Sequence, residues 1–140
     1  MWLVGVTLLA SSQIIKGADD RAMYECIMFQ ICECGHIDYY IDCFDKAPEM
    51  LRNRTASALH GCNFGFLEQY DPPTIENTSC GLDRDTFYPC FSEAYNSMKN
   101  YERETSRDIT RAGEKYEIED GKRCLTSYLA RCLDETNECF

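Results

Sequence analysis

The stretch that organises this chain runs from Pro89 to Tyr116 and reads PCFSEAYNSMKNYERETSRDITRAGEKY. At about 100° of rotation per residue, as in an α-helix, its mostly apolar side chains fall on one stripe. The members of the stripe are Phe91, Ala94, Tyr95, Met98, Tyr101, Thr105, Ile109, Ala112 and Tyr116. Charged side chains occupy the other face. The pattern therefore predicts one long amphipathic helix, with Pro89 in its first turn and a break or bend at Gly113.

Shorter periodic patterns predict further helices on both sides of this stretch. Those before it are expected over residues 19–34, 36–47 and 49–60, ending at Gly35, Pro48 and Gly61. Asp120 is expected to cap a last helix that extends to about Glu135. Residues 62–79 contain the breaker pair Pro72-Pro73 and are predicted to form a long loop. The sequence thus predicts a single all-α domain of four to five helices, cross-linked by about five disulfides.

Residues 1–18 have the pattern of a secretory signal peptide, because a short apolar run is followed by small residues. The run is far shorter than the ~20 residues that span a bilayer. Cleavage is expected after Ser12, Gly17 or Ala18, which leaves residues 19–140 as the disulfide-rich helical domain. No later segment is apolar enough to form a transmembrane helix. We therefore expect the protein to be secreted and extracellular.

The cysteine count agrees with secretion. Ten cysteines lie beyond the signal segment: Cys26, Cys32, Cys34, Cys43, Cys62, Cys80, Cys90, Cys124, Cys132 and Cys139. An even number in a secreted chain predicts five disulfides. Cys32 and Cys34 point to different sides of any regular element, so each should bond elsewhere. Cys124 and Cys132 lie about two turns apart on one helix and cannot pair with each other, so they should reach the first helices or Cys90.

Two N-x-S/T sequons, at Asn53 and Asn77, predict N-glycosylation at exposed positions. The chain has 24 acidic and 14 basic residues, a formal net charge of −10, which argues against nucleic acid and anionic membranes as partners. Arg103, Arg107 and Arg111 lie one turn apart. They form either a docking strip for an anionic surface or, as we favour, part of a mixed-charge helix face.

One segment resembles an enzyme site. Cys32-Glu33-Cys34-Gly35-His36-Ile37-Asp38 is similar to the helix of secreted phospholipases A2 in which a His-Asp pair follows two cysteines. That resemblance implies a histidine that activates water and an aspartate that helps to hold calcium. Here Ile37 separates His36 from Asp38 and no glycine-rich calcium loop precedes them. We interpret His36 as a surface residue near a helix start, and we predict no catalytic residue.

Other candidate sites have simpler interpretations. The acidic stripe Asp38, Asp42, Asp45 and Glu49 could gather calcium, but a solvated helix face explains it better. His60 lies at a helix C-terminus, where the helix dipole favours an imidazolium. The Cys-x-Cys could suggest a zinc site, but in an oxidising compartment we expect its cysteines to form disulfides. We therefore predict neither a metal nor a cofactor.

Aromatic side chains on the long helix allow two interpretations. They either pack in the core or line an apolar pocket between helices, for which tyrosine supplies both apolar and polar surface. The residues that would line such a pocket are Phe91, Tyr95, Met98, Tyr101 and Tyr128.

The C-terminal half carries a family resemblance in Cys90-Phe91 through Tyr116, Cys124-Leu125, Tyr128-Leu129 and Cys132-Leu133. It resembles cysteine-rich, all-helical secreted proteins of arthropods and nematodes, of the haemolymph, salivary or venom type. This resemblance implies an extracellular interaction factor that binds a protein partner. The chain is also similar to insect odorant-binding proteins, because Cys34 and Cys43 have one of their two typical spacings, although no pair has the other. That second resemblance implies a carrier of a small apolar ligand.

Overall fold

The computed structural model describes residues 20–134 and 138–139. The predicted signal segment, with cleavage after Ser12, Gly17 or Ala18, lies outside the described residues. Within them the chain is helical and has no strand, which confirms the prediction of a single all-α domain. The described residues contain six helices, one more than the predicted upper number.

The first helix is α-helical over residues 20–28 and continues as a π-helical turn, η1 (Phe29–Glu33). The elements that follow are α2 (Ile37–Phe44), α3 (Glu49–His60), α4 (Pro72–Gly81), α5 (Arg84–Arg107), the 3₁₀ turn η2 (Ile109–Arg111) and α6 (Ala112–Asp134). Gly35 has a φ of 70° and ends the first helix as predicted. Helix α3 has the predicted bounds.

The predicted long helix from Pro89 to Tyr116 is wrong at both ends. Helix α5 begins earlier, because the Asp83 carboxylate accepts hydrogen bonds from the N–H groups of Asp85 and Thr86 and caps the helix there. Pro89 therefore lies inside α5 and not in its first turn.

The same stretch also contains a reversal of the chain. Helix α5 ends at Arg107, and α6 has already begun at Ala112, so one predicted helix is in fact parts of two. The predicted cap at Asp120 is wrong because this residue lies inside α6. Gly113 lies in the first turn of α6 and close to the predicted break.

The predicted loop over residues 62–79 is wrong in its second half, where α4 begins at Pro72. Pro72 and Pro73 occupy the first turn of this helix, where a missing N–H costs no intrahelical hydrogen bond. The proline pair therefore starts a helix. Asn63, with a φ of 62°, turns the chain just after α3.

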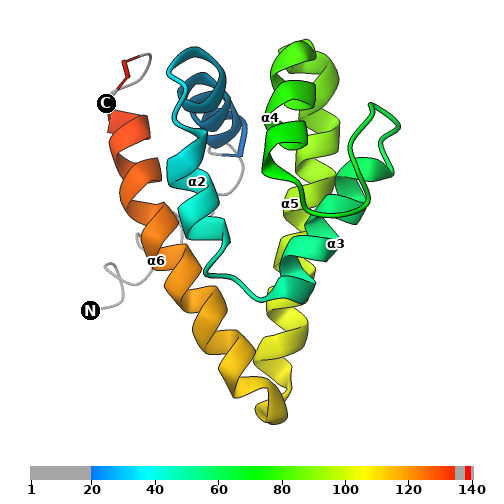
Figure 1. Cartoon of the computed structure of the whole chain (residues 1–140). Helices are drawn as coiled ribbons and strands as arrows, with labels where there is room; N and C mark the ends of the chain where they lie inside the picture. Colours follow the sequence, from blue (N-terminus) through cyan, green and yellow to red (C-terminus); the bar gives the residue numbers. More distant parts are fainter. Residues whose placement is uncertain (1–19, 135–137, 140) are drawn as a thin grey trace, which may run out of the picture.

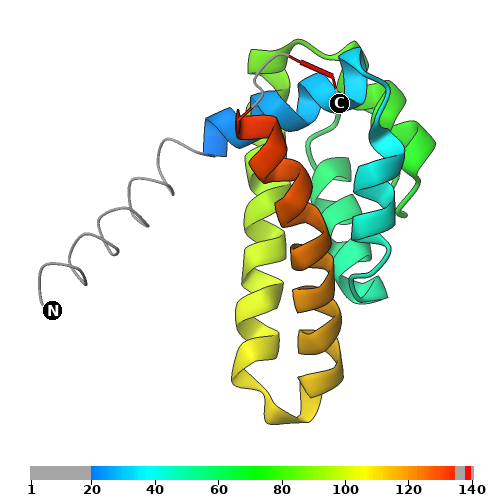
Figure 2. The same cartoon turned by 90° about the vertical axis from the view of Figure 1, so that its left-hand side faces the viewer.

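Helices α5 and α6 form an antiparallel hairpin, and the other helices pack at the end away from its turn (Figure 1). Its turn lies at the lower end in Figure 1 and in Figure 2, and the two helices lie close together at that turn and diverge away from it in Figure 1. Helix α3 packs on α5, α2 packs on α6, and α4 packs on η1. We call residues 99–123, which contain the turn, the distal hairpin, and the rest of the described structure the head.

Five disulfides cross-link the head, as predicted. They are Cys26–Cys132, Cys32–Cys80, Cys34–Cys139, Cys43–Cys124 and Cys62–Cys90. Cys32 and Cys34 bond to different partners, and Cys124 and Cys132 reach the first helices, which confirms both geometric arguments. The distal hairpin contains no cysteine.

Two apolar clusters form the core. The larger one lies in the head and consists of Tyr24, Met28, Leu59, Phe66, Phe87, Cys90 and Ala94. The smaller one joins the distal hairpin to α3 and consists of Ala47, Leu51, Tyr101 and Ile118, with Phe44 and Met98 packed against it. Disulfides and the larger cluster therefore stabilise the same end of the molecule.

Candidate functional site

The turn that joins α5 to α6 is fixed by one aspartate. The Asp108 carboxylate accepts hydrogen bonds from the Thr110 N–H at 3.0 Å and from the Thr110 hydroxyl at 2.6 Å. These hydrogen bonds hold the pKa of Asp108 below its ordinary value. The Arg111 N–H donates to the Asp108 carbonyl at 3.0 Å and closes the turn. An aspartate satisfies the free N–H groups where a helix begins, and this one therefore directs the chain reversal.

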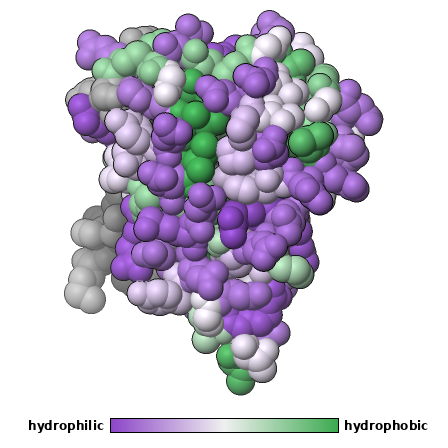
Figure 3. All heavy atoms as spheres, in the orientation of Figure 1, coloured by the Kyte–Doolittle hydropathy of each residue, from purple (hydrophilic) through white to green (hydrophobic). Residues whose placement is uncertain are grey.

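This turn presents an isoleucine to solvent. Ile109 is 93% exposed and Tyr116, near the start of α6, is 67% exposed. Figure 3 shows apolar atoms at the lower end of the molecule, where the turn lies in Figure 1. Burying a large exposed apolar side chain against a partner lowers the free energy of the complex. We call Ile109 and Tyr116, together with the flanking Arg107 and Lys115, the distal tip.

Beneath the tip, Tyr101 is fully buried and contacts two arginines. The guanidinium carbons of Arg54 and Arg111 lie 5.0 and 5.1 Å from the centre of its ring. Arg54 also pairs with Glu104, with 2.9 Å between Nη2 and Oε2. Arg111 pairs with Glu114. These five residues, the Tyr101 clamp, join α3, α5, η2 and α6, so cation–π contacts and ion pairs together hold the tip in place.

The charges around the clamp act on one another. The hydrogen bond from Arg54 lowers the pKa of Glu104, and burial raises the pKa of Tyr101. A further link joins the two helices of the hairpin, because Lys122 Nζ lies 2.7 Å from Glu102 Oε1. The hydrogen bond to Glu102 raises the pKa of Lys122. Ion pairs therefore link the helices of the distal hairpin, which contains no cysteine.

The distal hairpin also differs from the head in charge. Residues 20–98 contain thirteen acidic and five basic side chains, whereas the distal hairpin contains seven of each. Of the predicted arginine strip, Arg103 donates to Asn100 and Arg111 belongs to the clamp. Arg107 and Lys115 are exposed and form no ion pair within the described part of the chain. The tip therefore offers two cationic side chains beside its apolar ones.

The residues that would line an apolar pocket, namely Phe91, Tyr95, Met98, Tyr101 and Tyr128, contact several different neighbours. Phe91 and Tyr95 stack on each other, with 6.4 Å between ring centres. Met98 and Tyr101 belong to the smaller apolar cluster. Tyr128 stacks on Tyr39 of α2 at 5.1 Å.

Two shallow hollows lie elsewhere on the surface. One is beside Arg84 and the Cys26–Cys132 disulfide, and the other is beside the Cys62–Cys90 disulfide. Neither is lined by any of these five residues, and an apolar pocket lined by them stays a prediction.

The other sequence candidates lie apart from the tip. The His36 ring stacks on Tyr39 at 4.9 Å, and His60 Nδ1 lies 2.8 Å from the Phe66 carbonyl oxygen. Exposed positions are occupied by all members of the acidic stripe: Asp38, Asp42, Asp45 and Glu49. Residues 20–134 and 138–139 contain no group of three or more side chains that could hold a metal ion.

Both predicted glycosylation sites lie on helices, and Asn53 and Asn77 are exposed. The hydroxyl-bearing residues of the two sequons, Thr55 and Ser79, are buried. Their hydroxyls donate to carbonyls one turn back in their own helices. Glycosylation itself stays a prediction.

Sequence reasoning missed the tip because Ile109 and Tyr116 continue the apolar period of the stripe. The signal that could have found it is Asp108-Ile109-Thr110, since an aspartate followed two residues later by threonine is typical of a side-chain-capped turn. Two antiparallel helices that face one core can share a periodic pattern across the turn between them.

No family model, curated protein or solved structure matches this chain. Among the helices of the described residues, none combines the length and apolar character needed to cross a membrane.

Proposed function

We propose that this chain is a secreted, disulfide-stabilised protein that binds an extracellular protein partner through its distal tip, and that it acts by binding without catalysis. The observation that carries the proposal is the 93% exposure of Ile109 on a turn whose conformation is fixed by hydrogen bonds. The five disulfides support an extracellular location, because such bonds persist in oxidising compartments.

The proposal requires that the tip keep one conformation before the partner arrives. Ordering a loop during association costs free energy and so weakens affinity, and a preformed surface avoids this cost. The Tyr101 clamp and the Asp108 turn supply such a surface. Burying one isoleucine side chain contributes about 2 kcal/mol, which corresponds to about thirtyfold in Kd.

The flanking charges indicate the chemistry of the partner. Arg107 and Lys115 lie near Ile109 in the sequence and lack ion pairs within residues 20–134 and 138–139. Carboxylates at the rim of an apolar pocket would complement them, since interfaces commonly place charge around an apolar centre. We therefore propose a protein partner with such a pocket.

The test compares wild type with Ile109→Asp and with Met50→Asp as baits in extracellular fluid of the source organism, after chemical cross-linking. Met50 is the matched control because it is 55% exposed and lies in α3, outside the distal hairpin. The proposal expects one protein to be retained by wild type and by Met50→Asp and to be lost with Ile109→Asp.

Unfolding measurements on the same variants guard against misfolding, and each surface substitution should change stability by less than about 0.5 kcal/mol. Capture that Ile109→Asp leaves unchanged would exclude the tip as the binding surface. A native mass spectrum with extra mass that disappears on denaturation would instead favour the carrier of a small apolar ligand.

A further inference from the structure

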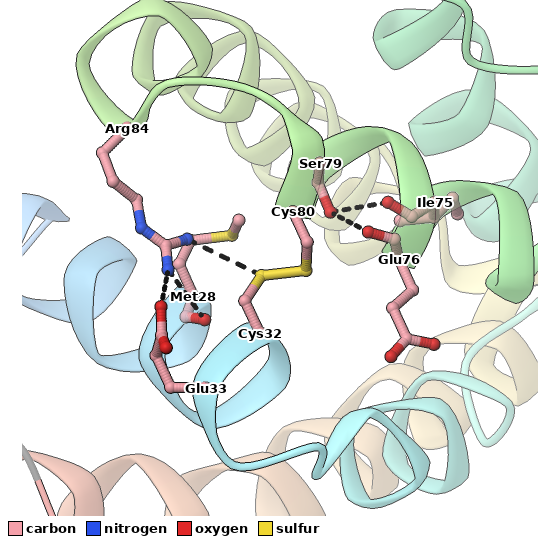
Figure 4. Close-up of a disulfide and its surroundings, with 8 residues drawn as sticks. All are labelled: Met28, Cys32, Glu33, Ile75, Glu76, Ser79, Cys80 and Arg84. Atoms are coloured by element: carbon pink, nitrogen blue, oxygen red, sulfur yellow. Dashed lines mark hydrogen bonds and ion pairs between the residues drawn. A yellow bond between two sulfur atoms is a disulfide. The ribbon is translucent and has the colours of Figure 1, made fainter.

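The disulfide between Cys32 and Cys80 joins η1 to α4 at a junction that a third element also reaches (Figure 4). Both cysteines are partly exposed, whereas Cys26, Cys43, Cys90 and Cys132 are buried. Arg84, the first residue of α5, extends its guanidinium toward this disulfide in Figure 4. The junction therefore places a permanent cation beside a disulfide whose two cysteine residues are partly exposed.

The arginine contacts one sulfur of the pair. Arg84 Nη1 lies 3.7 Å from Cys32 Sγ. Its Nη2 donates to the Met28 carbonyl at 3.3 Å and lies 3.6 Å from Glu33 Oε1, so the guanidinium is held by the helix that carries Cys32. This geometry keeps the cation next to Cys32 in the folded protein.

The Cys80 side of the bond has different surroundings. Ser79 precedes Cys80 in α4, but its hydroxyl is engaged with the carbonyls of Ile75 and Glu76 at 2.6 and 3.3 Å. The two sulfurs of one disulfide therefore differ in electrostatic environment.

This asymmetry matters for thiol–disulfide exchange. An incoming thiolate forms a bond to one sulfur, and the other sulfur departs with the bonding electron pair as a thiolate. A neighbouring guanidinium stabilises a thiolate, so the sulfur beside it is the better leaving group. At this junction the favoured leaving group is Cys32.

We propose that Cys32–Cys80 is a thiol-exchange site, where an external alkyl thiolate attacks Cys80 Sγ and Cys32 leaves as a thiolate paired with Arg84. One sulfur–sulfur bond forms between the incoming thiol and Cys80 as the Cys80–Cys32 bond breaks. The sum of oxidation states is unchanged, and no other oxidant or reductant is needed. The product is a mixed disulfide on α4 and a thiolate on η1.

This site lies in the head and does not depend on the proposed binding at the distal tip. Its opening would release α4 from η1, while the other four disulfides continue to cross-link the head. The chemistry selects a substrate class: thiols small enough to attack the sulfur of a partly exposed cysteine in α4, such as a cysteine-containing peptide.

The experiment treats the folded, fully oxidised protein with reduced glutathione, traps free thiols with excess maleimide, and maps both adducts by mass spectrometry without reduction. The expected result is glutathione on Cys80 and maleimide on Cys32, about tenfold over the reverse arrangement. Cys139 is exposed, so Cys34–Cys139 also reacts. The informative quantity is therefore the ratio of the two adduct arrangements within the Cys32–Cys80 pair, that is, which cysteine carries glutathione and which carries maleimide.

Arg84→Gln should bring the two arrangements close to equal and slow exchange at this pair roughly three- to tenfold. Arg52→Gln is the matched control, because the two arginine side chains are similarly exposed, at 27% and 30%, and Arg52 pairs with Asp45. The control should keep the wild-type arrangement.

Three results would overturn the proposal: equal adducts in wild type, glutathione mainly on Cys32, or no exchange at this pair. If the folded Arg84→Gln variant still carries glutathione mainly on Cys80, Arg84 does not cause the preference, and this result would also overturn the proposal. If Arg84→Gln does not fold, the arrangement in wild type decides alone.

Discussion

The head and the distal hairpin of this protein are stabilised in different ways. Five disulfides and the larger apolar cluster lie in the head, whereas residues 99–123 have no cysteine and share a cluster of four buried residues with their neighbours. The distal hairpin instead depends on the Tyr101 clamp, the Glu102–Lys122 pair and the capped turn. Disulfides therefore cross-link α5 and α6 to the head on either side of a distal hairpin that has none.

The two regions also face solvent differently. The head is acidic, which favours solubility, while the distal hairpin has balanced charge and an exposed isoleucine. The proposed binding at the distal tip needs exposed apolar area in a defined position, and the clamp provides that position. The following changes break or sharpen this contrast, beginning with the largest expected effect.

Removing the disulfide nearest the hairpin should have the largest effect. Cys43–Cys124 joins α2 to α6 across a sequence separation of 81 residues, so the double variant Cys43→Ser with Cys124→Ser should lose about 4 kcal/mol. Denaturant unfolding measures the loss. In the control, Cys62→Ser with Cys90→Ser, amide exchange in the distal hairpin should stay closer to wild type. Equal acceleration in both variants would argue against two separately stabilised regions.

Two tyrosines with 0% exposure allow a direct comparison between the regions. Tyr101→Ala removes the centre of the clamp and should cost about 3 kcal/mol, through loss of packing and of both cation–π contacts. Its amide exchange should rise over residues 99–123. Tyr24→Ala, in the larger cluster, should cost a similar amount but accelerate exchange in the head. If both variants affect the same amides, the division into two regions is wrong.

Alanine substitutions at two glycines of α6 should change stability in opposite directions and by smaller amounts. A Cβ at Gly121 would lie 3.2 Å from the Cys43 carbonyl oxygen, so Gly121→Ala should destabilise by about 1 kcal/mol despite the better helix propensity of alanine. A Cβ at Gly113 would meet nothing within 4 Å. Gly113→Ala should therefore stabilise by about 0.5 kcal/mol. Thermal unfolding of the two variants separates the signs, and a gain at both positions would contradict the close approach of α2 and α6.

Acid should loosen the distal hairpin by a small amount. The pKa values of Glu104 and Asp108 lie below their ordinary values of 4.5 and 3.8. The unfolded chain binds more protons at these groups, so the stability that they contribute is complete above the ordinary values. It is lost as pH falls through the lower folded values. Protection factors over residues 99–123 should therefore fall in that range.

Two variants control this measurement. Asp108→Asn keeps a capping side chain without a carboxylate, and Glu104→Gln removes the ion pair with Arg54. Combined, they should leave protection of the hairpin less dependent on pH. The same acid dependence in wild type and in the double variant would show that other groups are responsible.

Much of the fold could be predicted from the sequence, because helix period and cysteine geometry are local properties. The bounds of α3 follow from its flanking Pro48 and Gly61, and the spacing of Cys124 and Cys132 excluded a bond between them. The start of α4 was missed because the pair Pro72-Pro73 is compatible with both a break and a first turn. The start of α5 was missed because Pro89 was interpreted as a first-turn residue, whereas the Asp83 cap begins the helix earlier.

The candidate site was harder to predict, because it depends on where a periodic pattern changes helix. Ile109 and Tyr116 fit the stripe of one helix in the sequence, and only the reversal at Asp108 exposes them. The clamp also depends on a long-range contact, since Arg54 comes from α3 and meets Tyr101 from α5. Periodicity carries no information about such pairs.

The most direct test of the account is amide hydrogen exchange of the free, oxidised wild-type protein, resolved over residues 99–123. If the tip is preformed, the amides of α5 and α6 next to the turn will be protected. The Arg111 amide, which donates to the Asp108 carbonyl, will be protected too. Full exchange of these amides at the shortest labelling time would show a frayed turn. That result would contradict the claim that the distal hairpin presents Ile109 in one fixed position.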